Sequence, residues 1–141
     1  MHPRQVALPA IALLISLLSC ATAFAHHSFA MFDQSRQVTL KGAVREFQWT
    51  NPHAFIHIAV AGASGTETVW QIELNSPNNL KRQGWKPTSL KPGDEVTLIL
   101  NPLKDGSNGG LFVAVTLPDG SILGDPTRAG GAQPINVPTT H

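Results

Sequence analysis

After residue 37, hydrophobic and polar residues alternate in five stretches, and a period of two is typical of half-buried β-strands. The first stretch runs from Val38 to Trp49, and its large apolar residues change from even to odd positions beyond Arg45-Glu46. Such a change of side within one strand predicts a bulge or a bend. Thr50-Asn51-Pro52 then ends the strand.

The next two stretches predict a β-hairpin. Residues 53–60 alternate, with one side apolar and the other carrying His53, Phe55 and His57. A segment rich in glycine and serine, residues 61–66, separates them from residues 68–74, where the alternation resumes. Two alternating runs joined by a short glycine-containing connection are the usual sign of paired neighbouring strands.

A short helix is predicted after the hairpin, because Ser76 can cap free backbone N–H groups and Pro77 suits the first helical position. Residues 96–100 and 111–117 supply two more strands, joined by a polar loop over residues 101–110. Three strands, one helix and two strands are the order of an OB-type barrel. We therefore predict a mostly β fold, a small five-stranded, partly open OB-like barrel with one short helix between strands 3 and 4.

The other segments divide the chain around this barrel domain, residues 38–123. Arg4, the 13-residue apolar run Val6–Leu18 and the small residues up to Ala25 match the three regions of a removable signal peptide, residues 1–25. The run is shorter than the roughly 20 residues that a membrane-spanning helix needs. Residues 26–37 are predicted to be an N-terminal leader, and residues 124–141 a flexible tail with little to bury.

A second interpretation of the export segment starts from Leu17-Leu18-Ser19-Cys20, which resembles a lipoprotein processing site. Cys20 would then be acylated and retained as a lipid anchor. We favour cleavage after Ala23-Phe24-Ala25, because Leu18 stands where a smaller residue is more usual. That cleavage makes His26 the first residue and removes the only cysteine. It predicts a periplasmic protein that has no disulfide and no membrane span.

The net charge of the chain argues against nucleic acid as a partner. The chain has ten Lys plus Arg and nine Asp plus Glu, and loss of Arg4 with the signal peptide leaves nine of each. Affinity for nucleic acid depends on a cationic surface that neutralises phosphates. We therefore expect no nucleic-acid partner.

Four motifs stand out along the chain: the HHSFAMFD start at residues 26–33, the FQWTNPH segment at residues 47–53, Ser76-Pro77-Asn78 with Gly84-Trp85, and the PLKDG segment at residues 102–106. Together they resemble a family of small exported bacterial envelope proteins of unknown function. The resemblance covers about residues 26 to 123 and implies a bacterial, periplasmic setting, but no chemistry.

The expected new amino terminus, His26-His27, is the candidate metal site. An N-terminal histidine offers its amine and a ring nitrogen as a chelate, and such ligands suit copper or another divalent transition metal. His53 and His57 have the H-x-x-x-H spacing, but on a strand their Cα atoms lie roughly 13 Å apart. At most one of them is expected to join His26 or His27 at one ion, and either can instead be a simple polar residue of the outer face.

Three aromatic residues are candidates for a ligand-binding face: Trp49, Phe55 and Trp85. Trp49 and Trp85 lie beside breaks in the chain, where an aromatic ring covers a barrel end or stacks on a ligand. We expect by default that both tryptophans cover a barrel end and do not stack on a ligand. Trp70, by contrast, falls in the inward register and is predicted to be core.

Features of an enzyme are missing from the sequence: no mature cysteine, no nucleophile-elbow pattern and no phosphate-binding glycine loop. The sequence therefore predicts an exported non-enzymatic binding protein, with a copper-like divalent ion held through the mature N-terminal histidines. The alternative is a metal-free periplasmic adaptor that binds an envelope protein or a small ligand on the open barrel face around Trp49, Phe55 and His57.

Overall fold

The computed structural model describes residues 29–125, 127 and 133–134. The chain divides into two compact units, Met1–Met31 and Phe32–His141, and the barrel belongs to the second. Within the described residues, no helix is both long and apolar enough to cross a membrane. The predicted signal peptide, His26 and His27 lie outside the described residues.

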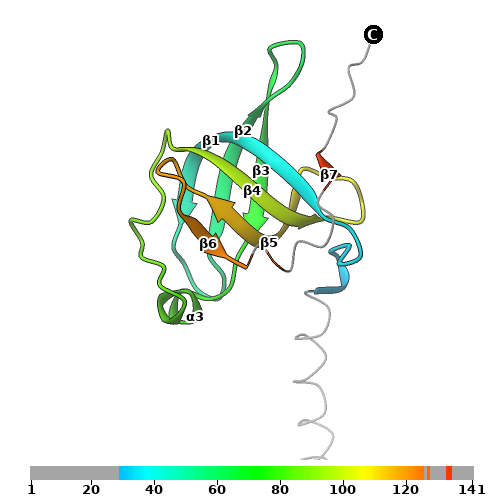
Figure 1. The fold of residues 1–141 in the computed structure, drawn as a ribbon. Helices are drawn as coiled ribbons and strands as arrows, with labels where there is room; N and C mark the ends of the chain where they lie inside the picture. The colour runs from blue at the N-terminus through cyan, green and yellow to red at the C-terminus, as the bar shows by residue number, and fades with distance from the viewer. Residues whose placement is uncertain (1–28, 126, 128–132, 135–141) are drawn as a thin grey trace, which may run out of the picture. The chain divides into compact units, whose positions relative to one another are not determined.

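β1 (Val38–Gln48) is the long bent strand that the sequence predicts, and it contributes to both halves of the barrel (Figure 1). Its first half pairs antiparallel with β4 (Glu95–Pro102), and its second half pairs antiparallel with β2 (Phe55–Ala61). The register with β2 shifts between Val44 and Glu46. The predicted bulge is therefore confirmed, at the point where the apolar positions change side.

Gly42 permits the close crossing of β1 over β2. A Cβ atom at this position would lie 2.1 Å from the carbonyl oxygen of Ala59. Only glycine allows the two backbones to approach so closely, which explains a glycine inside a strand.

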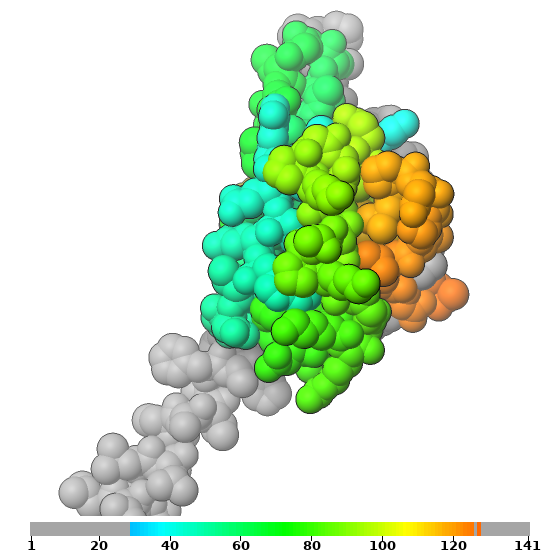
Figure 2. Space-filling view, turned by 90° about the vertical axis from the view of Figure 1, so that its left-hand side faces the viewer, coloured from blue at the N-terminus to red at the C-terminus, as the bar shows by residue number. Residues whose placement is uncertain are grey.

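β2 and β3 (Glu67–Glu73) form the predicted hairpin, paired along their whole length. Its tip extends beyond the rest of the barrel (Figure 1, Figure 2), and there the N–H of Gly62 donates to the carbonyl oxygen of Thr66 at 2.8 Å. Almost all residues from 61 to 69 are exposed. The tip therefore adds little to the core, and the hairpin is held by its lower half.

Helix α3 (Pro77–Arg82) follows β3 and begins as predicted. The side chain of Ser76 accepts a hydrogen bond from the N–H of Asn79 at 3.4 Å, and Pro77 occupies the first turn. Leu80 is 1% exposed and packs into the core. Gly84 has a φ of +89°, the left-handed conformation that ends helices and that glycine adopts without strain.

β5 (Gly109–Thr116) completes the barrel, because it pairs antiparallel with β4 and, through its first three residues, parallel with β3. The strand order is β2-β3-β5-β4-β1, and β1 also pairs with β2. The predicted OB-like barrel with a helix between strands 3 and 4 is confirmed, and its ring is closed rather than partly open. The loop between β4 and β5 is reduced to residues 103–108, since both strands extend into the predicted loop.

One apolar core fills the barrel. Alternation places the side chains of Ile56 and Ile58 of β2 inside, and neither is exposed at all. Complete burial of such a side chain contributes about 1.5–3 kcal/mol. Trp70, predicted to be core, is partly buried and packs against the edge of this cluster. The other large side chains that are fully buried are Trp85, Val44, Ile72, Leu80, Leu98, Leu100 and Val115.

Two short strands that the sequence did not predict follow β5. β6 (Ile122–Gly124) pairs antiparallel with β5, and β7 (Gln133–Pro134) pairs parallel with the start of β1. Gly124, placed at the start of the predicted tail, thus lies in a strand. Strands of two or three residues are too short for an alternation pattern to reveal.

The second half of the predicted leader packs on the barrel. Phe32 is 3% exposed and bridges to Leu103, and the N–H of Asp33 donates to the carbonyl oxygen of Pro102 at 2.8 Å. The side-chain amide of Asn101 donates to the carbonyl oxygen of Arg36 at 2.8 Å. The domain therefore begins at Phe32 rather than at residue 38, because burial of a phenyl ring outweighs the cost of ordering a short segment.

Candidate functional site

The outward-facing side chains of four neighbouring strands form two rows across the barrel. Residues directly opposite each other in a sheet share one side, and the buried partners Phe47, Ile56 and Ile72 mark the inner side. We call the opposite surface the outer face. One row is Gln48, Phe55, Glu73 and Leu111, and the other is Glu46, His57, Gln71 and Gly109.

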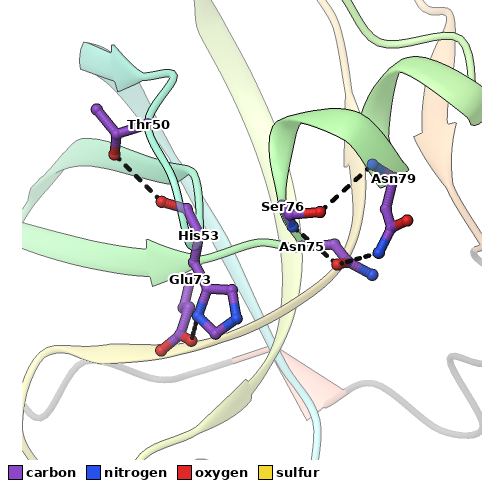
Figure 3. A network of polar contacts seen from close by, with 6 residues as sticks. All are labelled: Thr50, His53, Glu73, Asn75, Ser76 and Asn79. Carbon is purple, nitrogen blue, oxygen red and sulfur yellow. Dashed lines mark hydrogen bonds and ion pairs between the residues drawn. The ribbon is translucent and has the colours of Figure 1, made fainter.

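The loop between β1 and β2 borders this face and is held against the start of α3. The N–H of Ala54 donates to the carbonyl oxygen of Asn75 at 3.2 Å, and the N–H of Leu74 donates to the carbonyl oxygen of Ala54 at 2.9 Å. Thr50 adds a hydroxyl hydrogen bond to the carbonyl oxygen of His53 at 3.2 Å (Figure 3). These bonds fix the backbone of the loop just where His53 enters β2.

Asn75 connects the loop to the helix cap. Its side-chain oxygen accepts hydrogen bonds from the N–H of Ser76 and the amide group of Asn79, each at 2.8 Å (Figure 3). Its carbonyl oxygen already holds the β1–β2 loop. One residue therefore couples the position of the loop to the start of α3.

His53 and Glu73 form a close polar pair on the outer face. Nδ1 of His53 contacts Oε1 of Glu73, and the two side chains are 33% and 18% exposed. Figure 3 shows the second ring nitrogen on the far side of the ring from the carboxylate. A histidine whose Nδ1–H donates to a carboxylate has its lone pair on Nε2, which is the atom left to act as an acceptor or a metal ligand.

His57 has a different environment. Its Nε2 lies 3.5 Å from the side-chain oxygen of Gln48, at the outer limit of a hydrogen bond. Its neighbours across the strands are Glu46 and Gln71. No carboxylate contacts the ring of His57 among the described residues, so the structure distinguishes the two candidate histidines that sequence spacing left equal.

One histidine and one carboxylate come together among the candidate metal ligands that the structure describes. In the described part of the chain, no group of three or more His, Cys, Asp or Glu side chains is arranged to hold an ion. His53 and Glu73 come together, whereas His26 and His27 lie outside the described residues. The chelate predicted at the amino terminus therefore stays a prediction.

The aromatic candidates lie on different sides of the sheet. Phe55 is half-buried on the outer face, whereas Trp85 is 2% exposed inside the barrel. Trp49 packs edge-on against Phe47 with ring centres 5.4 Å apart, and Phe47 contacts Trp85 at 5.7 Å. A second edge-on contact joins Trp85 to Phe112 at 5.3 Å. Trp85 is therefore a core residue and Trp49 packs against the core, whereas Phe55 lies in the outward register of β2.

Glu73 is the residue that sequence reasoning missed. Its partner becomes visible only when the hairpin register is known. That register pairs Phe55 with Glu73 and brings the carboxylate beside His53. A signal was present in the sequence, since the glycine-rich connection restricts the register of the two strands.

Three exposed aspartates stand in turns around the barrel, and each accepts hydrogen bonds from the serine two residues later. The hydroxyl of Ser35 donates to Asp33, that of Ser107 to Asp105 and that of Ser121 to Asp119, each at 2.6 Å. These bonds lower the pKa of each aspartate below its usual value, with the serine side chain as the largest cause. The carboxylates stabilise turns and do not gather at one place in the described structure.

The protein is a small, closed, OB-like barrel whose outer face is polar and partly aromatic. The chain belongs to a family of unknown function, DUF6152, whose sequence pattern it matches over residues 13–113. No curated protein and no solved structure matches this chain.

Proposed function

We propose that the protein is an exported, non-enzymatic binding protein of the periplasm that holds a divalent, copper-like transition metal ion. In this proposal the ligands are the amine and ring of His26, together with His27 and one histidine from the barrel. The observation that carries the proposal is the contact between Nδ1 of His53 and Oε1 of Glu73. It supports His53, rather than His57, as the barrel ligand, with Nε2 as the atom that would bind the metal.

The chemistry of histidine ligands supports this choice. A metal-binding histidine nearly always donates its second ring N–H to a carboxylate, a carbonyl or water, which fixes the tautomer and the orientation of the ring. His53 has such a carboxylate, whereas His57 has only a long contact to Gln48. The partial exposure of His53, 33%, leaves space for an ion to reach the ring.

Export is required by the same proposal. Cleavage after Ala25 leaves a free amine on His26, and a chelate of amine and imidazole needs that amine. Acylation of Cys20 would instead leave residues 20–25 ahead of His26. The proposal therefore predicts that the mature protein begins at His26 and carries no lipid, which an intact mass measurement of protein purified from the envelope will test.

Copper titration separates the proposed ligands. Isothermal titration with Cu(II) is compared for the mature protein, for a form with one residue added before His26, and for His53→Ala. Both changes are expected to weaken binding at least about tenfold, since each removes a ligand. His57→Ala is the matched control, because it removes the imidazole of β2, the strand that begins two residues after His53, and is expected to leave the affinity unchanged.

Two results would overturn parts of the proposal. Equal affinity of the native and extended forms would refute the terminal chelate, and the metal-free adaptor would then become the better interpretation. A loss of affinity in His57→Ala but not in His53→Ala would show that Glu73 does not select the barrel ligand.

A further inference from the structure

The outer face is an unusual surface for a small barrel, because polar side chains surround one half-buried phenyl ring. Phe55 lies between Gln48 on β1 and Glu73 on β3, with His57 two residues further along β2. Across β1, β2 and β3 the two rows have a width of about 10 Å at an interstrand spacing of about 4.8 Å. At β5 the second row ends at the buried Gly109, where the side chain of Leu103 lies against the backbone. The loops before β2 and before β5 border this surface.

Charge limits what this face can bind. Neither row contains a lysine or an arginine, and both contain a carboxylate, Glu46 in one and Glu73 in the other. Arg45, next to Glu46 in the bulge, is ion-paired with Glu67, which lies on the same side of β3 as Gln71 and Glu73. A phosphate backbone or another polyanion would therefore meet two carboxylates and a cation whose charge is already neutralised. Glu46 is exposed but Glu73 is half-buried against His53, so the face is also a poor match for a strongly cationic partner.

Hydrogen-bonding capacity points to a ligand with many hydroxyl groups. The amides of Gln48 and Gln71 each donate and accept, the carboxylates accept, and the ring of His57 can do both. A hydroxyl group is itself both donor and acceptor, and a sugar ring has hydroxyls on its rim and an apolar C–H surface on its face. The ring of Phe55 offers the flat apolar surface on which such a face can pack.

We propose that the outer face binds an uncharged oligosaccharide, with Phe55 as the stacking platform and Gln48, His57 and Gln71 as hydrogen-bonding partners. The site spans β1, β2 and β3 and does not require the metal. OB-type barrels use the surface of strands 2 and 3 with the adjoining loops for oligosaccharides and oligonucleotides, and the missing positive charge favours the former. A width of about 10 Å accommodates more than one sugar ring.

Nuclear magnetic resonance titration of the mature protein in EDTA tests this site. The probes are cellohexaose and the hexamer of N-acetylglucosamine, and saturable shifts of the amides of residues 46–48, 55–57 and 71–73 are expected with at least one of them. Phe55→Ala is expected to weaken binding about tenfold. Gln71→Ala, an exposed position whose change will not disturb the core, is expected to weaken it several-fold.

A matched control and two competing ligand classes complete the experiment. Ile122→Ala removes a 51% exposed aliphatic side chain from β6, outside both rows, and is expected to leave sugar binding unchanged. Absence of saturable shifts with both sugars overturns the proposal. It is equally overturned if single-stranded oligothymidine or an oligolysine peptide binds these residues and the sugars do not. Because EDTA removes any metal, failure here leaves the metal proposal untouched, and success does not depend on it.

Discussion

The two sides of the β2–β3 hairpin are built from alternate residues of the same strands, yet they differ in almost every property. Inside, Ile56, Ile58 and Ile72 are completely buried and belong to the apolar core. Outside, Phe55, His57 and Glu73 remain half-exposed and include the one His–Glu pair of the described structure. The inner side determines stability, and the outer side has the spare hydrogen-bonding capacity that a binding surface needs.

Truncation on the inner side is expected to have the largest effect. Ile56→Ala removes buried methyl and methylene groups from a position with no exposure and should lower the free energy of unfolding by about 2–5 kcal/mol. Urea unfolding followed by tryptophan fluorescence measures the change. A loss below about 1 kcal/mol would mean that this side of the hairpin is not the tightly packed core described above.

Removal of the carboxylate on the outer side should change affinity more than stability. Glu73→Ala is expected to weaken Cu(II) binding by about 10- to 100-fold, because the ring of His53 loses the group that orients it. Glu73→Gln keeps a hydrogen-bond acceptor and should retain part of the affinity. If both variants bind copper as the native protein does, His53 is not a ligand, whatever the amino terminus contributes.

Truncation of the outer aromatic residue should cost less stability than truncation of the inner isoleucine. Phe55→Ala is expected to lower the free energy of unfolding by about 1 kcal/mol, since the ring is only half-buried and leaves no closed cavity. The same urea experiment provides the comparison. A loss as large as that of Ile56→Ala would show that Phe55 is part of the core and is not available as a stacking platform.

The aspartate turns, which belong to neither side of the hairpin, should have the smallest effect and a distinct pH dependence. The hydrogen bonds from Ser121 lower the pKa of Asp119 below 3.8 in the folded state. The associated stabilisation is therefore complete above about pH 3.8 and is lost as the pH falls through the lowered value. Unfolding midpoints of the native protein and Ser121→Ala should differ at pH 6 and converge toward pH 2. A difference that is constant with pH would contradict this assignment.

Sequence reasoning was most successful where a pattern is local. The bulge after Val44 and the cap at Ser76 each depend on a few neighbouring residues, and both are present in the structure. It was least successful at the ends of the domain. The bridge between Phe32 and Leu103 and the pairing of β7 with β1 join segments far apart in the chain. A hydrophobic period depends only on neighbouring residues, so it does not predict such contacts.

The alternation of side chains by itself determined which residues of the hairpin face inward, because successive residues of a strand point to opposite sides whatever the rest of the fold does. Tertiary structure alone decided which outward residues meet. His53 and His57 are equivalent in a list of spacings, and only the register between β2 and β3 brings Glu73 to one of them. Register depends on the turn and on core packing across strands, so it is a property of the folded chain and not of either strand alone.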